Sequence, residues 1–279
     1  MRAGLVQLSC SDDPAANLVQ TLEYVEQAAR AGADLIATPE VTNLVTMHRA
    51  HQEQVLRTEA EDQTLAALRE AAAQHGCWIL IGSLALKGEI DARFVNRSVL
   101  IDGTGAIRAR ADKIHRFDVI LPGGEQYRES AGYRPGTQAV LAETPWGSLG
   151  MSVCYDLRFP AQFRGLSQAG ATLLTIPSAF TVPTGRAHWE ALLRARAIEC
   201  GAFVLAPAQT GTHTARHGTE RKTYGHSLAI DPWGKVLADG GSQPGVTLVD
   251  LDLNQVQARR AQIPSLLHDV DYAKPAGLT

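Results

Sequence analysis

The sequence predicts a single α/β domain whose sheets are covered by other layers of structure. Three observations support this prediction. Strand-like apolar runs alternate with helix-like patterns, several strands are apolar on both faces, and no Ser-, Gly- or Pro-rich stretch resembles an interdomain linker. Strands that are apolar on both faces are typical of sheets packed between other layers. The 279 residues suffice for one large domain of this kind.

The first half of the chain is predicted to open with a strand and a long helix. Pro14 suits the first turn of that helix and Gly32 suits its end, while Gly76 is expected to close a second helix. An Asp-Gly-Thr-Gly turn at 102–105 favours a hairpin. The predicted elements are a strand over 3–8, a helix over 14–31, a strand over 34–38, a helix over 62–75, a strand over 77–85 and a hairpin over 98–111.

The second half continues the alternation of strands and helices. Its first strand leads directly into Cys154, and Pro160 suits the first turn of the helix that follows. The predicted elements are a strand over 148–153, a helix over 160–168, a strand over 171–176, a helix over 187–199, and strands over 202–206, 227–230 and 246–250.

A long polar segment at 208–223 is predicted to be a loop, and long loops are often functional or mobile. It carries His213 and His217, four residues apart. Because no third ligand stands nearby, a metal site is only weakly indicated. A solvated loop is the preferred interpretation.

Composition and charge exclude several classes of function. Lys and Arg total 26 against 29 Asp and Glu, a net charge of −3, which argues against binding to nucleic acid or to an anionic membrane. No apolar run is long enough to span a bilayer, and the first residues resemble a strand rather than a signal peptide. We therefore expect a cytoplasmic protein. The four cysteines include no Cys-x-x-Cys pair, so a zinc ribbon or a thioredoxin-like site is not expected.

Three residues at strand ends are candidates for catalysis. Cys154 lies between a strand and a helix, where a helix N-terminus favours the thiolate, although a buried structural cysteine is an equally good interpretation. Glu40 follows a strand, where ligands gather in α/β folds, but it could instead begin a helix. Lys113 follows the hairpin, and most such lysines are simply solvated.

The motifs around these residues resemble the nitrilase superfamily of carbon–nitrogen hydrolases, and within it the Nit branch. The likeness runs through nearly the whole chain. Its motifs are Pro39-Glu40, Ala-Asp-Lys-Ile-His over 111–115, Val-Cys-Tyr-Asp-Leu-Arg-Phe-Pro over 153–160, and the segments 177–180, 184–190, 192–199, 224–227 and 231–234.

The resemblance implies an amide hydrolase with a Glu–Lys–Cys triad. Cys154 would be the nucleophile, Glu40 the general base, and Lys113 the group that stabilises the oxyanion. Glu129 would position Lys113 and the substrate, and the backbone N–H of Tyr155 would be a second oxyanion donor. The chemistry suits these residue types, because a thiolate can attack an unreactive amide carbonyl and form a thioester. No step requires a metal or an organic cofactor.

Substrate recognition is expected to involve residues beyond the triad. Arg158 could bind a substrate carboxylate, since a guanidinium pairs with a carboxylate through two hydrogen bonds. The alternative for Arg158 is a structural ion pair with Asp156 or Glu190. By the same resemblance, Phe180 and Thr181 would line the pocket. Trp189 and Trp233 are expected to be packing residues.

The resemblance also implies a fold and an assembly. The fold would be a four-layer αββα sandwich formed by one carbon–nitrogen hydrolase domain over 1–279. The C-terminal tail, about 255–279, would lie at the interface of a homodimer or a higher homo-oligomer.

Several functions remain open at this point. The preferred substrate is a small α-keto amide such as deaminated glutathione, and the alternative is ω-amidase action on α-ketoglutaramate, for which tryptophan is usual at the place of Tyr224. A true nitrilase is less favoured. Outside the superfamily, the chain could be a papain-like Cys–His hydrolase using His188 or His226, or a non-enzymatic interaction protein that merely keeps the fold.

Overall fold

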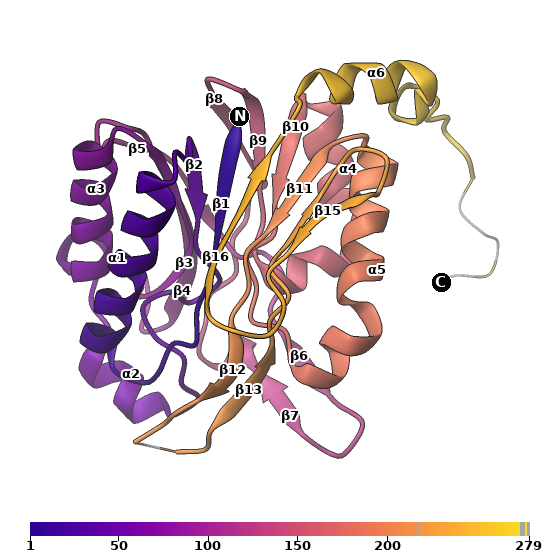
Figure 1. The fold of residues 1–279 in the computed structure, drawn as a ribbon. Helices are drawn as coiled ribbons and strands as arrows, with labels where there is room; N and C mark the ends of the chain where they lie inside the picture. Colours follow the sequence, from indigo (N-terminus) through magenta and orange to yellow (C-terminus); the bar gives the residue numbers. More distant parts are fainter. Residues whose placement is uncertain (217, 274–276, 278–279) are drawn as a thin grey trace.

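Two six-stranded sheets form the centre of the computed structural model, which describes residues 1–216, 218–273 and 277 (Figure 1). In the first sheet the strand order is β16-β1-β2-β3-β4-β5, and in the second it is β15-β14-β11-β10-β9-β8. The strands of the first sheet are β1 (Arg2–Gln7), β2 (Leu35–Ala37), β3 (Trp78–Lys87), β4 (Phe94–Ile101), β5 (Ile107–Asp112) and β16 (Gly245–Asp250). Those of the second sheet are β8 (Val140–Thr144), β9 (Gly147–Met151), β10 (Ala171–Thr175), β11 (Phe203–Ala206), β14 (Leu228–Ile230) and β15 (Val236–Asp239).

Helices cover the outer face of each sheet, so the molecule has four layers in the order αββα (Figure 1). The first sheet carries α1 (Pro14–Arg30) and α3 (Gln63–His75), and the second carries α4 (Pro160–Gln168) and α5 (Val182–Cys200). The predicted fold class is therefore confirmed.

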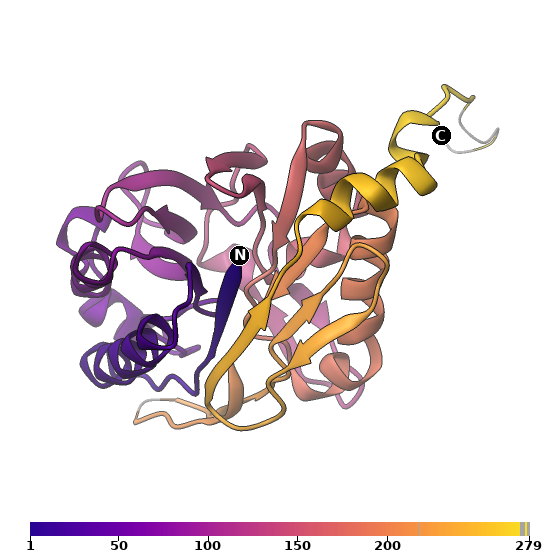
Figure 2. The same cartoon turned by 45° about the horizontal axis from the view of Figure 1, so that its top comes forward.

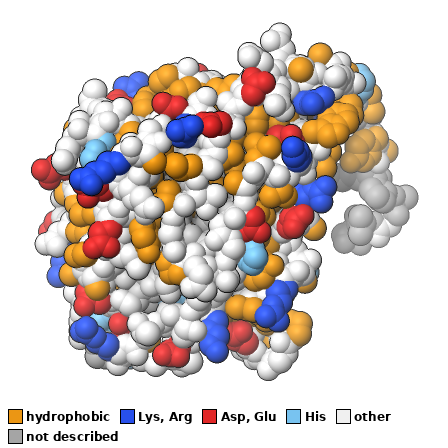
Figure 3. All heavy atoms as spheres, in the orientation of Figure 1, with side chains coloured by type: hydrophobic (Ala, Val, Ile, Leu, Met, Phe, Trp, Pro, Cys, Tyr) orange, Lys and Arg blue, Asp and Glu red, His pale blue; other side chains and the backbone are white. Residues whose placement is uncertain are grey.

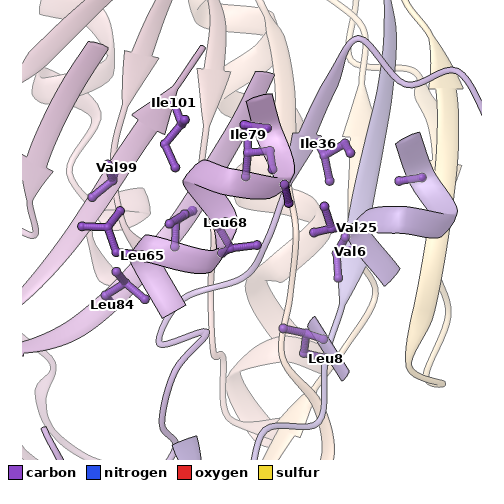
Figure 4. Close-up of a cluster of buried hydrophobic side chains, with 14 of the residues drawn as sticks. Val6, Leu8, Val25, Ile36, Leu65, Leu68, Ile79, Leu84, Val99 and Ile101 are labelled. Atoms are coloured by element: carbon purple, nitrogen blue, oxygen red, sulfur yellow. The ribbon is translucent and has the colours of Figure 1, made fainter. Parts of the chain in front are cut away.

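Three apolar layers hold these sheets and helices together. One buried cluster lies between α1, α3 and the first sheet, and includes Val25, Leu68 and Ile79 (Figure 4). A second packs α4 and α5 on the second sheet. The third joins the inner faces of the two sheets through side chains such as Leu5, Leu80 and Leu205. This explains why so many strands are apolar on both faces.

The helix boundaries follow the local sequence closely. The Asp13 carboxylate accepts hydrogen bonds from the backbone N–H groups of Ala15 and Ala16 at the start of α1, a standard N-terminal cap. Helix α3 ends at Gly76, whose φ of +63° suits glycine. Helix α5 begins at Val182 rather than at 187, because the extended Thr181 and the early Pro183 already start the turn.

The predicted loop at 208–223 is instead built around a β-hairpin. Strands β12 (Thr210–His213) and β13 (Arg221–Tyr224) pair in antiparallel fashion. His213 is buried rather than solvated, with one ring nitrogen against the Cys10 carbonyl and the other against the Thr223 hydroxyl. The interpretation as a solvated loop was therefore wrong for His213, while His217 lies outside the described residues.

Short elements that the sequence analysis did not predict complete the fold. Besides the edge strands β8 and β15 of the second sheet, they include α2 (Arg49–Val55), the hairpin of β6 (Asp118–Ile120) and β7 (Gln126–Arg128), and α6 (Asn254–Gln262). Helix α6 and the residues after it project from the body of the molecule (Figure 2). In the described part of the chain, no helix combines the length and the apolar character needed to cross a bilayer.

Candidate active site

The three candidate catalytic residues come from three different strands and meet in one cavity. Glu40 follows β2, Lys113 follows β5 and Cys154 follows β9. All three side chains line a cavity of about 350 Å³, whose walls come mostly from segments that follow the strands. Each of the three residues is at most 6% exposed. Residues 73 and 41 positions apart along the chain thus share one site.

Lys113 is held between two carboxylates. Its Nζ donates to Glu40 Oε1 at 2.8 Å and to Glu129 Oε2 at 2.8 Å. The Asn96 amide also donates to Glu40 Oε1, at 2.9 Å. A buried lysine with two carboxylate partners stays charged, and its position is set by both of them.

The second oxygen of Glu40 is also occupied, which fixes the orientation of the carboxylate. Glu40 Oε2 accepts a hydrogen bond from the backbone N–H of Ala179 at 3.0 Å. This close approach of two segments depends on Gly82, where an added Cβ would lie 2.5 Å from the Pro39 oxygen and 2.4 Å from Pro177 Cβ. Any larger residue at position 82 would therefore push the Glu40 and Ala179 segments apart.

Cys154 has a left-handed backbone conformation at the start of a short 3₁₀ turn, Cys154–Arg158. Its φ is +49°, and its N–H donates to the Pro177 carbonyl at 3.0 Å. Asp156 holds this turn, because its carboxylate accepts from the Val153 N–H and from both the N–H and the ring Nδ1 of His115. Asp156 therefore ties the Cys154 turn to the segment that carries Lys113.

The charges of the site decide where its protons lie. Burial and the negative charge of Glu40 raise the pKa of the Cys154 thiol well above its usual range, so the expected stabilisation of a thiolate by a helix N-terminus is not found. Helix α4 begins only at Pro160. Burial alone would raise the pKa of Glu40, but the charge and hydrogen bond of Lys113 hold it below its ordinary value. Burial likewise opposes the charge of Lys113, yet Glu129 and Glu40 raise its pKa well above normal.

The remaining predicted site residues also line this cavity: Glu129, Tyr155, Arg158, Phe180 and Thr181. The backbone N–H of Tyr155 donates to no atom in the described part of the chain. Such a free donor beside Cys154 could hydrogen-bond to a bound carbonyl oxygen.

Arg158 does not form the structural ion pair that was the alternative interpretation. Its guanidinium lies over the rings of Tyr155 and Phe180 and contacts His188 Nδ1 at 3.3 Å, whereas Asp156 pairs with His115. The expectation for the tryptophans is only half correct. Trp189 is buried, but Trp233 is 52% exposed, with Arg259 over its ring.

Among the cavity residues that sequence reasoning missed are Asn96 and Arg221. Asn96 lies in β4 and is buried, and a polar residue within an apolar strand was a usable signal. Arg221 lies on β13 and lines the cavity with its guanidinium 5.6 Å from the Tyr127 ring. No local pattern distinguished it from other arginines of a polar segment.

Other chemistries find less support in this geometry. Neither His188 nor His226 lines the cavity, and His226 Nδ1 contacts Asp239 instead. A Cys–His arrangement is therefore not what surrounds Cys154. The described residues contain no group of three His, Cys, Asp or Glu side chains placed to hold a metal ion.

Comparison with known proteins gives a consistent result. The carbon–nitrogen hydrolase family model matches residues 2–261. Deaminated glutathione amidases from Yersinia enterocolitica and Mus musculus are 39% and 38% identical, over 95% and 94% of this chain and 91% and 81% of theirs. The crystal structure of the C. elegans NitFhit protein superposes with a TM-score of 0.88 at 35% identity, covering 96% of this chain and 64% of that longer one.

Proposed function

The chain belongs to the carbon–nitrogen hydrolase family and is a hydrolase of non-peptide amide bonds, and on this premise we propose that Cys154, Glu40 and Lys113 form its catalytic triad. The observation that carries the proposal is the buried Glu40–Lys113–Glu129 cluster beside Cys154, in a cavity of about 350 Å³. A nucleophile, a base and a fixed positive charge are the three groups that acyl transfer needs.

In the first step, the Glu40 carboxylate takes the thiol proton while the sulfur attacks the amide carbonyl. The carbon–sulfur bond forms as the carbonyl π-electrons move onto oxygen. Lys113 Nζ and the Tyr155 N–H stabilise this oxyanion, each contributing roughly 3–4 kcal/mol. The Glu40 carboxylate and the Cys154 thiol line the same buried cavity, and each shifts the pKa of the other, so the proton passes between them without an intermediate base.

In the second step, the protonated Glu40 gives its proton to the leaving amine. The carbon–nitrogen bond breaks, the amine departs, and a thioester of Cys154 remains. Glu40 then takes a proton from a water molecule as the water oxygen attacks the thioester. The carbon–sulfur bond breaks, the acid product leaves, and the sulfur recovers its proton from Glu40. Glu129 keeps Lys113 in place throughout.

The proposed substrate is deaminated glutathione or a similar α-keto amide. Two features support it: the relatives named above carry that activity in their names, and Tyr224 stands where ω-amidases usually have tryptophan. The alternative substrate is α-ketoglutaramate, which shares the acyl half. Initial rates with both amides decide between them, and a large preference for α-ketoglutaramate would contradict the first choice.

The triad is tested by mass spectrometry of the intact protein, quenched during turnover of deaminated glutathione. We expect an acyl adduct on the wild type and on a matched Cys77→Ala variant, which removes another buried thiol. Cys154→Ala should show neither adduct nor turnover, a loss of at least about 10³-fold. An active Cys154→Ala variant, or an adduct on another cysteine, would contradict the proposal.

We further propose that the chain is a single domain that forms a homodimer through its C-terminal tail. Large hydrophobic side chains are exposed in this tail, namely Ile263, Leu267, Val270 and Tyr272, and the exposed Trp233 lies against Arg259 of α6. Figure 3 shows hydrophobic side chains gathered beside the grey C-terminal residues. Exposed apolar patches of this kind often mark protein interfaces.

A cytoplasmic location is also proposed, because all four cysteines are free thiols and reduced thiols are usual in that compartment. Fractionation of the producing cells checks it, and recovery of the activity outside the cytoplasm would contradict it.

A further inference from the structure

The cavity has more positive charge than the proposed triad uses. Its basic side chains are Arg49, Lys113, Arg128, Arg158 and Arg221, and its acidic ones are Glu40 and Glu129. Both carboxylates are already bonded to Lys113, and Arg49 pairs with Glu53 outside the cavity. A net positive, partly buried cavity favours an anionic substrate.

Arg221 has hydrogen-bonding capacity left over inside this cavity. Its Nη2 donates to the Ala179 carbonyl at 2.6 Å, and its guanidinium faces the Tyr127 ring. Its Nε is buried without a partner among the described residues. A buried donor without a partner is costly, and a bound carboxylate would satisfy it.

The position of Arg221 indicates which half of the substrate it faces. Ala179 bonds to Arg221 through its carbonyl and to Glu40 through its N–H, so the guanidinium lies on the Glu40 side of the site. The leaving amine must lie on that side too, because Glu40 protonates it. Arg158 lies over the rings of both Tyr155 and Phe180, and we assign this second cation to the acyl half.

From this arrangement we infer that Arg221 binds a carboxylate on the amine half of the substrate. The inference rests on the proposed amidase function and adds a specificity-determining residue to it. Arg221 then selects amides whose leaving amine is an amino acid or a short peptide over amides that release ammonia. Deaminated glutathione, whose amine half ends in a glycine carboxylate, meets this requirement.

The test compares two substrates that differ only at this carboxylate. One is deaminated glutathione, and the other is the same compound with its terminal carboxylate replaced by a neutral carboxamide. Release of the α-keto acid is followed for both. For the wild type we expect a KM about 10- to 100-fold higher for the carboxamide, the range expected for charge-assisted hydrogen bonds, with kcat little changed.

Substitution of Arg221 should remove this preference. Arg221→Gln is expected to raise KM for deaminated glutathione by about the same factor and to leave KM for the carboxamide unchanged. Arg221→Lys, which keeps the charge but not the paired donors, should fall between. The matched control is Arg108→Gln, which alters an exposed arginine outside the cavity and should behave as the wild type.

Each other outcome overturns the inference. A wild type that does not discriminate between the two substrates rejects it even if the Arg221 variants fail to fold. Equal loss on both substrates in Arg221→Gln would show a structural or acyl-side role. If the wild type hydrolyses neither compound but hydrolyses other amides, the proposed substrate fails and this inference fails with it. If the wild type prefers deaminated glutathione but Arg221→Gln keeps that preference, another residue binds the carboxylate. The proposed function then still stands, because deaminated glutathione is hydrolysed.

Discussion

Cys154 carries its proton at rest and Glu40 carries none, although both are buried in the same cavity. Burial raises the pKa of the thiol, while Lys113 keeps the pKa of the carboxylate low. The site therefore stores its negative charge on Glu40, next to a fixed cation. In the proposed mechanism the thiolate forms only as the carbon–sulfur bond forms, and a protonated resting thiol is less open to oxidation than a thiolate.

Backbone strain lies at Cys154 and next to Glu40, the two residues of the proposed proton transfer. Cys154 and Val41, the residue after Glu40, have φ values of +49° and +50°. For a β-branched residue such a value is a genuine outlier, costing about 1–2 kcal/mol. The Val41 N–H donates to the Ser83 hydroxyl, which helps to hold this conformation and with it the direction of the Glu40 side chain.

Glycine at position 41 should therefore be tolerated unusually well. Replacing alanine by glycine normally costs about 0.5–1 kcal/mol, but here we expect Val41→Gly to be at least as stable as Val41→Ala. Urea unfolding gives both free energies. The control pair is wild type and Ala66→Gly, at an exposed position in α3, where glycine should cost about 1 kcal/mol. A Val41→Gly protein less stable than Val41→Ala by that amount would show that position 41 is unstrained.

At the scale of elements, the β12–β13 hairpin does more than close the cavity. It carries Arg221 and Tyr224 on one strand and His213 on the other. His213 anchors the hairpin to the first sheet's end through the Cys10 carbonyl. Gly185 of α5 receives the Tyr224 ring, since an added Cβ would lie 2.2 Å from it. The hairpin is thus packed from both halves of the molecule.

The anchor makes stability depend on pH in a defined window. Burial lowers the pKa of His213 to about 4 from its usual value of 6.5. As the pH falls from 6.5 to 4, the unfolded chain binds a proton there that the folded chain does not, so stability is lost. The loss from this residue is up to about 3 kcal/mol.

His213→Asn should lower stability at pH 7, because a buried hydrogen bond is lost, but should flatten the fall between pH 6.5 and 4. Urea unfolding across this range measures both effects. His268→Asn, an exposed position, is the control and should keep the wild-type slope. An unchanged slope in His213→Asn would mean that folding does not lower the pKa of His213.

At the scale of the whole molecule, the two sheets bring the site together and the C-terminal segment extends away from it. Arg164 bonds to Asp269 and Arg260 donates to the Ala171 carbonyl at 2.6 Å, so this segment is attached to the α4–α5 side. Its apolar side chains nevertheless face outward. The proposed dimer gives them a partner.

Leu267→Glu should therefore shift the protein from dimer to monomer in sedimentation velocity runs, because Leu267 is 83% exposed and a charge in an apolar interface is costly. Ile90→Glu changes an equally exposed residue, 80%, in a turn of the first sheet, and should leave the dimer intact. A monomeric wild type, or a Leu267→Glu dimer of wild-type strength, would reject the interface.

The alternation of apolar strands and helices was enough to predict the layered α/β fold, because a strand that is buried on both faces is apolar at nearly every position. Most helix ends were predictable for a similar reason, since Pro14, Gly76 and Pro160 act locally. The motifs around Glu40, Lys113 and Cys154 also predicted which side chains would meet. The hairpin at 210–224 escaped prediction, because its strands are polar and residues such as His213 are buried by segments distant in the chain.

The sequence by itself indicated the reaction class and its candidate residues, through the resemblance of its ordered motifs to the carbon–nitrogen hydrolases. Only the tertiary structure decided the protonation of Cys154, the pairing of Asp156 with His115, and the place of Arg221 beside Glu40. These depend on desolvation and on distances between residues far apart in the chain. The sequence specifies the type of a side chain but not its environment. The charge of a carboxylate, a thiol or a guanidinium and its available hydrogen bonds are set by the groups packed around it.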